Sequence, residues 1–77
     1  MKRKIIGIST IPGELHPALG PKYLVRFDDQ TTKQIYAEWF FDIEGVDFDP
    51  FKPHKGLMGL EVSDEWYKQF VVITKGL

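Results

Sequence analysis

The sequence predicts a small, mainly antiparallel β-domain of about five strands with at most one short helix, closed into a barrel or left as an open roll. The chain has 77 residues, which allows a single domain over residues 1–77 and leaves no room for a second. Short β-branched or alternating segments recur along it, separated by turns that contain glycine or proline. Aromatic residues make up 14% of the chain, and their large buried areas offset the small core that so short a chain can form.

The first predicted strand covers residues 4–11, KIIGISTI, which are short and rich in β-branched side chains. Strict alternation would place Ile6 and Ile8 on one face and Ile5 and Ile11 on the other. Pro12 and Gly13 follow as a turn signal. Residues 14–21 then hold two further prolines and are expected to form an irregular loop.

A hairpin is the clearest prediction. Residues 23–27 alternate, with Tyr23, Val25 and Phe27 on one face. Polar residues 28–31 make the turn, and residues 32–40 form the second strand, with Ile35 on the inner face. Strand alternation in this segment also places Trp39 and Phe40 on opposite faces.

The second half of the chain is predicted in less detail. Residues 41–55 hold two prolines and are expected to form a surface excursion anchored by its phenylalanines. Residues 57–62 are strand-like, and residues 66–74 form a last strand with Val71 and Ile73 buried. In a competing interpretation, Ser63 caps a short helix over residues 64–70, and residues 71–74 remain a buried strand.

Residues 23–32, YLVRFDDQTT, followed by Ile35 and Trp39, resemble the central hairpin of Tudor-type and other SH3-like small β-barrels. Gln30 stands where those domains usually have glycine. The resemblance implies an SH3-like barrel. Some domains of this kind use a phenylalanine and an acid of the hairpin in a methyl-lysine cage, and the matching positions here are Phe27 and Asp29.

Composition excludes several classes of protein. The chain has no cysteine, which rules out a disulfide scaffold, a cysteine-based zinc site and thiol catalysis. Its formal net charge of -1 argues against a general binder of polyanions. No segment has the apolar length of a membrane span or of a signal peptide, so we expect a cytoplasmic protein without a membrane partner.

The residues that enzymes need are sparse. The two histidines, His16 and His54, both fall in predicted loops. Asp47 and Asp49 could join His54 at a metal ion, but none of these residues has metal-ligand spacing. Glycine-rich phosphate-binding motifs are absent from the sequence. We therefore expect no catalytic activity, no metal and no cofactor.

Charge and aromatic residues provide the functional prediction. Five acids and no base lie between Glu38 and Asp49, and they form either a solvated loop or a surface that attracts a cationic partner. The aromatic side chains outnumber what a small barrel can enclose, so some are exposed or covered by loops. The predicted function is a non-catalytic interaction module or accessory subunit that binds a protein or peptide. Its candidate binding residues are Phe27, Asp29, Trp39, Phe40, Phe41, Asp47, Phe48 and Asp49.

Two alternatives remain open. A nucleic-acid-binding barrel would use a set of basic residues with Tyr36 or Trp39 as a stacking platform. That basic set is Lys2, Arg3, Lys4, Lys22, Arg26 and Lys33. A self-associating structural protein would instead form a homodimer that buries tryptophan or phenylalanine at a twofold interface.

Overall fold

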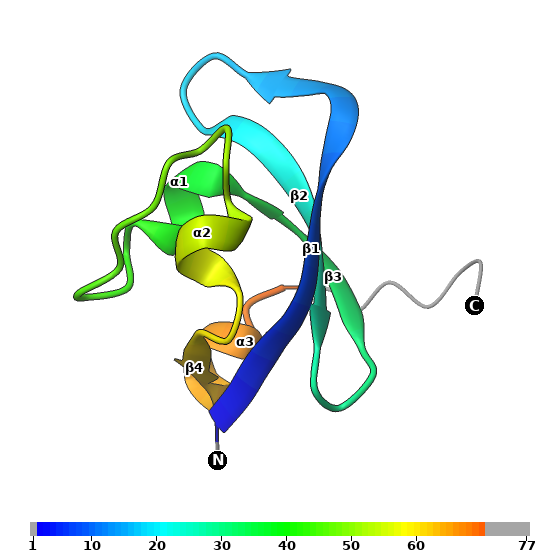
Figure 1. The fold of residues 1–77 in the computed structure, drawn as a ribbon, viewed down its shortest axis with the longest axis vertical. Coiled ribbons are helices and arrows are strands. Elements are labelled where there is room, and N and C mark those ends of the chain that lie inside the picture. Colours follow the sequence, from blue (N-terminus) through cyan, green and yellow to red (C-terminus); the bar gives the residue numbers. More distant parts are fainter. Residues whose placement is uncertain (1, 71–77) are drawn as a thin grey trace.

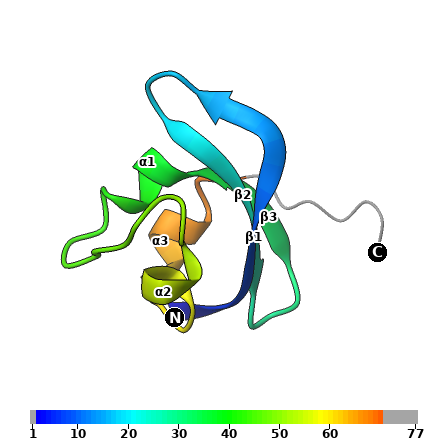
Figure 2. The same ribbon diagram turned by 45° about the horizontal axis from the view of Figure 1, so that its top comes forward.

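The computed structural model describes residues 2–70 and confirms a mainly antiparallel β fold, built as an open sheet. The four strands are β1 (Lys2–His16), β2 (Gly20–Phe27), β3 (Thr32–Tyr36) and β4 (Glu61–Ser63), in the sheet order β3-β2-β1-β4. Three short helices, where at most one was expected, are α1 (Ala37–Phe40), α2 (His54–Leu57) and α3 (Asp64–Tyr67). All three lie on the same side of the sheet (Figures 1 and 2).

The predicted hairpin is present as β2 and β3. Tyr23 pairs with Ile35, and the inward-facing Tyr23, Val25 and Phe27 are completely buried. The turn is closed by a hydrogen bond from Gln30 N–H to the Phe27 carbonyl, with an N···O distance of 2.9 Å. Gln30 has a φ of 72°, the left-handed conformation that glycine adopts most easily. Gln30 thus stands at a backbone position that a glycine would occupy with less strain.

Strand β1 departs from strict alternation. Ile5 lies opposite Phe27 and Gly7 opposite Arg26, so Ile6 is an extra residue that forms a bulge. The bulge shifts the phase of the strand by one residue, and both Ile5 and Ile8 pack against the core. The prediction that the Ile6 and Ile8 side chains point to the same face of the strand is therefore wrong, and Ile6 is exposed.

The first turn also comes later than predicted. Gly13 has a φ of 78°, and the register shifts between Thr10 and Leu15, which lets β1 pass through Pro12 and continue to His16. The residues expected to form an irregular loop are therefore largely the facing ends of β1 and β2. The chain turns only at residues 17–19.

Strand β3 ends at Tyr36, four residues earlier than predicted, because the chain turns into α1. Glu38 N–H donates to the Leu19 carbonyl across 3.0 Å, which fixes α1 against the β1–β2 turn. Helical spacing buries both Ala37 and Phe40. The expected strand arrangement, with Trp39 and Phe40 on opposite faces, is replaced by this helix.

Residues 41–53 form the surface excursion, attached to the core at specific points. Phe48 is buried, and the Tyr23 hydroxyl donates to the Pro50 carbonyl across 2.6 Å. Phe51, expected to be an anchor, is 78% exposed. Gly56 of α2 lies so close to the excursion that a Cβ atom there would be 2.5 Å from the Asp47 carbonyl oxygen. This close packing keeps α2 against the excursion. Of the strand predicted over residues 57–62, only residues 61 and 62 belong to a strand, because α2 takes residue 57 and a turn follows it.

Of the two interpretations of the last segment, the capped helix is confirmed over residues 64–67. Trp66 N–H donates to the Ser63 hydroxyl across 3.2 Å, and Asp64 and Glu65 occupy the first turn. Trp66 is therefore helical and does not begin a strand. The predicted strand at residues 71–74, with Val71 and Ile73, lies outside the described residues.

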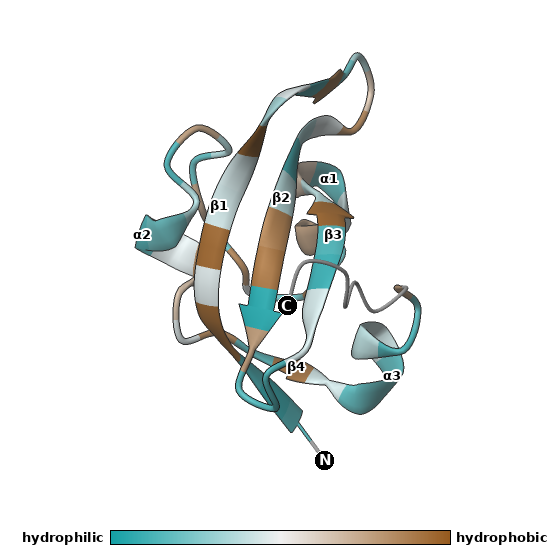
Figure 3. Cartoon of the chain, turned by 90° about the vertical axis from the view of Figure 1, so that its right-hand side faces the viewer, coloured by the Kyte–Doolittle hydropathy of each residue, from teal (hydrophilic) through white to brown (hydrophobic). Residues whose placement is uncertain are grey.

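One hydrophobic core joins the inner face of the sheet to the helices. The buried apolar residues are Ile5, Tyr23, Val25, Phe27, Ile35, Ala37, Phe40, Phe48, Leu57, Val62 and Tyr67. In Figure 3, which is coloured by hydropathy, hydrophobic residues lie along the middle of β1 and β2, whereas α3 is hydrophilic. Among the described residues, no helix has the length and apolar character needed to cross a membrane.

Candidate functional site

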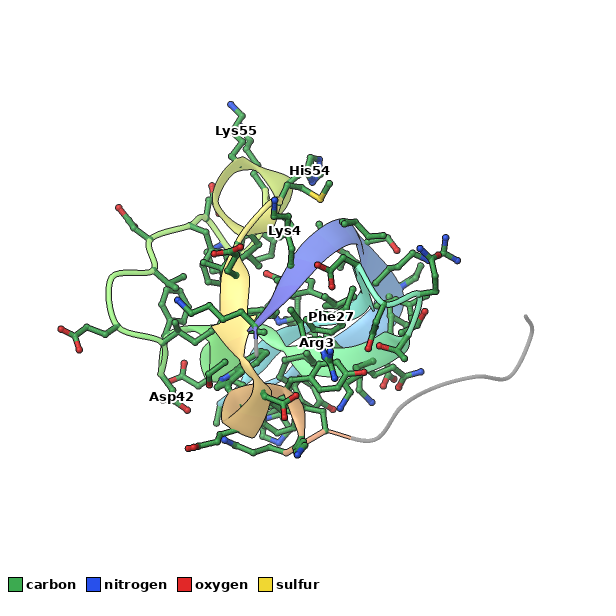
Figure 4. All side chains as sticks on the ribbon, turned by 90° about the horizontal axis from the view of Figure 1, so that it is seen from below. Arg3, Lys4, Phe27, Asp42, His54 and Lys55 are labelled. Carbon is green, nitrogen blue, oxygen red and sulfur yellow. The ribbon has the colours of Figure 1, made fainter. Side chains whose placement is uncertain are left out.

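A hollow of about 520 Å³ lies between α1 and α3 and is walled mainly by aromatic side chains. Helix α1 supplies Trp39 and the turn after it supplies Asp42, while α3 and its following turn supply the opposite wall. In Figure 4, Asp42 lies near α3 and far from Lys55, which points outward from α2. We call this site the aromatic hollow, and its lining residues are Trp39, Asp42, Trp66, Gln69 and Phe70.

Contacts between aromatic rings hold the walls of the aromatic hollow. The Phe70 ring lies 5.2 Å from Trp39 and 4.7 Å from Trp66, measured between centroids. Trp66 also packs at 5.2 Å on the buried Phe40, and Trp39 packs edge-on against Tyr36 at 5.3 Å. Trp39, Trp66 and Phe70 are thus each half-buried and supported from behind, which keeps part of each ring available to a ligand.

The carboxylate of Asp42 is the charged group of the aromatic hollow. Asp42 is exposed, and within residues 2–70 it takes part in none of the ion pairs. Aromatic faces carry negative electrostatic potential and attract cations, particularly where water is partly excluded. Three rings and one carboxylate therefore make this site suited to a cationic group.

A second hollow, of about 300 Å³, continues from the first because Asp42 and Trp66 line both. Its remaining wall is formed by β4 and the residues next to it, with the acid Glu61 and the base Lys2 at the surface. A chain longer than one side chain could therefore lie across Trp66 and contact both hollows.

The structure separates the predicted binding residues. Trp39 lines the aromatic hollow, whereas Phe40 and Phe48 lie in the core, where Phe40 packs against Trp66. Phe41 is 45% exposed and stacks on Phe48 with centroids 4.7 Å apart. Asp47 and Asp49 are exposed on the excursion, outside the lining of the aromatic hollow.

Phe27 and Asp29 lie at a different aromatic and acidic cluster, which the chain fills with its own cations. Phe27 is fully buried and meets the edge of Tyr67 at 5.0 Å. The Tyr67 ring has the Lys33 ammonium 3.7 Å and the Arg3 guanidinium 4.7 Å from its centroid. Arg3 also pairs with Asp29, with an Nε···Oδ2 distance of 3.4 Å. An external cation would have to displace these internal partners.

Protonation in this cluster follows from its contacts. Burial alone would raise the pKa of Asp29, but hydrogen bonds from Thr31 and Tyr67 and the charge of Arg3 outweigh it and hold that pKa below its usual value. Burial lowers the pKa of the Lys33 ammonium, and the charges of Asp29 and Asp64 only partly oppose the shift. The Lys33 side chain donates to the carbonyls of Tyr67 and Phe70, which ties β3 to the end of α3.

Three of the six basic residues named for nucleic-acid binding have partners within the fold. Arg3 and Lys33 lie over the Tyr67 ring, in the cluster with Phe27 and Asp29 described above, which we call the Tyr67 cluster. Lys22 pairs with Glu14 across 3.5 Å and also lies over the Tyr36 ring. Tyr36 was considered as a stacking platform, but the rings of His16 and Trp39 both pack edge-on against it. The other three, Lys2, Lys4 and Arg26, are exposed and take part in none of the ion pairs found within residues 2–70.

Trp66, Phe70 and Asp42 were not among the predicted binding residues. A signal for the first two was present, because helical continuation after the Ser63 cap places residues four apart on one side. Asp42 was counted only within the acidic stretch, because its approach to α3 depends on the helical turn of α1.

Comparison of the chain with protein-family models, curated proteins and solved structures finds no match. Among the described residues, no three histidine or acidic side chains gather at a possible metal site.

Proposed function

We propose that this chain is a non-catalytic interaction module that binds a cationic peptide segment of a partner protein. A lysine or arginine side chain of the partner occupies the aromatic hollow. The observation that carries the proposal is the convergence of Trp39, Trp66 and Phe70 with the carboxylate of Asp42 around one hollow.

The physical chemistry favours a long basic side chain. Its aliphatic stem packs on the indole and phenyl rings, and its charged end approaches both the ring faces and Asp42. A contact of this kind contributes about 0.5–2 kcal/mol, depending on how far the cation is desolvated. The neighbouring hollow, lined in part by Glu61, provides room for the flanking peptide.

Charge around the site supports a protein partner. All five acids from Glu38 to Asp49 are exposed, so they attract a basic segment from a distance and repel phosphate groups. Three of the six basic residues considered for nucleic-acid binding have partners within the fold, which weakens their attraction for phosphate groups.

A titration followed by NMR tests the proposal. The probes are N-acetyl-lysine methylamide and its uncharged counterpart N-acetyl-norleucine methylamide, which match in stem length and differ in the ammonium group. We expect the lysine probe to shift the indole N–H signals of Trp39 and Trp66 more strongly than the norleucine probe.

Variants separate the contact from general charge. Asp42→Asn is expected to weaken binding of the lysine probe about two- to five-fold, the scale of a partly exposed ion pair. Asp47→Asn removes an equally exposed acid outside the hollow and should leave the affinity nearly unchanged. Equal responses to both probes, or equal losses in both variants, would contradict the proposed function.

A further inference from the structure

A separate apolar groove of about 330 Å³ lies beside α1, away from the aromatic hollow. One wall is the turn between β1 and β2, and the other is the excursion near Pro50. The groove is lined chiefly by Leu15, Pro17, Leu19, Glu38, Pro50 and Phe51. Consecutive residues of α1 divide the two sites, since Glu38 lines the groove and Trp39 lines the aromatic hollow.

The groove carries the two most exposed large apolar side chains of the described chain. Leu15 is 67% and Phe51 78% exposed, although they come from segments far apart in the sequence. Exposed apolar side chains are ordinary when scattered singly, but two that line one concave site mark a place of contact. The fold thus brings them together without covering either.

Specific hydrogen bonds hold both walls. Nδ1 of His16 accepts from the N–H groups of Ala18 and Leu19, each across 3.0 Å, and this closes the β1–β2 turn. The Leu19 carbonyl in turn accepts from Glu38 N–H. On the other wall, Tyr23 donates to the Pro50 carbonyl across 2.6 Å. A groove held open in this way loses little conformational entropy when a ligand enters.

We propose that this groove is a second binding surface, which accepts an apolar side chain of a partner peptide that has lysine or arginine beside it. The apolar part contacts Leu15 and Phe51, and the basic neighbour pairs with Glu38, which is the one acid or base with a full charge among the described lining residues. Glu38 is exposed and takes part in none of the ion pairs found within residues 2–70. The prolines of the walls have no N–H to offer, so recognition depends on side chains rather than on an added strand.

Charge also distinguishes this partner from a second copy of the chain. In a twofold dimer the same patch faces itself, so the two Glu38 carboxylates would approach one another across the apolar contact. Like charges in a partly dry interface oppose association. A basic apolar peptide turns the same carboxylate into an attraction.

The test uses the full chain labelled with ¹⁵N and three tripeptide amides, each N-acetylated. They are Lys-Leu-Lys, Lys-Ser-Lys and Glu-Leu-Glu, which vary the apolar side chain and the charge independently. We expect Lys-Leu-Lys at millimolar concentration to shift the amide signals of Leu15, Leu19 and Glu38. Lys-Ser-Lys should shift these signals at least three-fold less, and Glu-Leu-Glu likewise.

Two surface variants complete the test. Phe51→Ser should abolish the response of Leu19 to Lys-Leu-Lys while leaving the response of the Trp39 indole to N-acetyl-lysine methylamide unchanged. Glu38→Gln should reduce the preference for Lys-Leu-Lys over Glu-Leu-Glu. The groove and the aromatic hollow therefore succeed or fail separately.

Two outcomes would overturn the inference. In the first, Lys-Ser-Lys and Lys-Leu-Lys shift the groove signals equally, or Phe51→Ser has no effect on them. In the second, sedimentation equilibrium finds a wild-type dimer that Phe51→Ser converts to a monomer, which would assign the groove to self-association.

Discussion

Tyr23 serves the core and the excursion at the same time. Its ring is buried between Phe40 and Phe48, with centroids 6.1 and 6.4 Å away, while its hydroxyl reaches the Pro50 carbonyl. Burial, followed by the negative charge of Asp49, raises the pKa of Tyr23 to about 12. Ionisation of this one side chain would therefore place a charge in the core and break the contact with the excursion.

This arrangement predicts a loss of stability in alkali. Because the folded-state pKa lies above the ordinary value of 10.0, the contribution of Tyr23 is complete below pH 10 and is lost as the pH rises towards about 12. Tyr23→Phe has no phenol to ionise, but at neutral pH it should be about 1 kcal/mol less stable because the Pro50 carbonyl loses its donor.

Urea denaturation of both proteins at several pH values between 8 and 12 checks this prediction. The advantage of the wild type over Tyr23→Phe should shrink across this range and then reverse. Proton loss from Lys33 occurs in both proteins and cancels in the comparison. A constant difference at all pH values would refute the assignment.

At the scale of elements, α3 depends on a side chain from the sheet. A four-residue helix leaves most of its carbonyls without helical partners, and Lys33 of β3 donates to those of Tyr67 and Phe70. Trp66 and Phe70 lie on the same segment and wall the aromatic hollow. Lys33, only 1% exposed, thereby acts as a positioning residue for two walls of the aromatic hollow.

We therefore predict that Lys33→Met destabilises the fold by about 1–3 kcal/mol, the cost of leaving buried polar groups without partners. Removing a buried charge recovers some desolvation energy, but two carbonyls lose their donor, and the second effect is the larger. The free energy of unfolding from urea curves measures this change. Affinity for N-acetyl-lysine methylamide should fall as well, because Phe70 is no longer held.

Lys68→Met is the matched control. Lys68 pairs with Asp64 across 3.0 Å, but its side chain is 71% exposed, so its loss should cost at most about 1 kcal/mol. If Lys33→Met were as stable as this control and bound the probe normally, Lys33 would have no positioning role.

The elements differ in how far local sequence specifies them. The β2–β3 hairpin was predictable because alternation and a polar turn agree over residues 23–36. Helix α1 was not, because Ile35, Ala37 and Trp39 continue the strand pattern and Tyr36 makes no side-chain cap. Its direction depends on the distant contact between Glu38 and Leu19. The aromatic hollow was not predictable for the same reason. The sequence indicated Trp39 as a binding residue, but it did not show that Trp39 lies next to Trp66 and Phe70.

For the whole molecule, nearly balanced charge conceals an uneven distribution. The net charge is -1, yet five exposed acids and no base lie between Glu38 and Asp49, while Arg3, Lys22 and Lys33 have partners inside the fold. We predict that the wild type does not bind a fluorescent oligothymidine at physiological salt, measured by anisotropy. Asp47→Lys combined with Asp49→Lys should bind more tightly, and this binding should weaken steeply as salt increases.

Lys2 and Lys4 provide the corresponding check, because both are exposed and neither belongs to the Tyr67 cluster. Tight wild-type binding that is lost when both are changed to alanine would favour the nucleic-acid alternative. Arg3 is unsuitable for this purpose, because its removal would also break the contacts to Asp29 and Asp64.

The position of β4 has a consequence for biosynthesis. Residues 2–4 of β1 pair with Glu61–Ser63, so the start of β1 must await a strand that is synthesised after β2 and β3. The meander of β1, β2 and β3 joins neighbours in sequence and can assemble early on the nascent chain. Until β4 arrives, Ile5 and Phe27 lack the cover of Val62 and α3, and the start of β1 remains an unpaired edge. The interval between these events is when a growing chain of this protein is most exposed to chaperones and to aggregation.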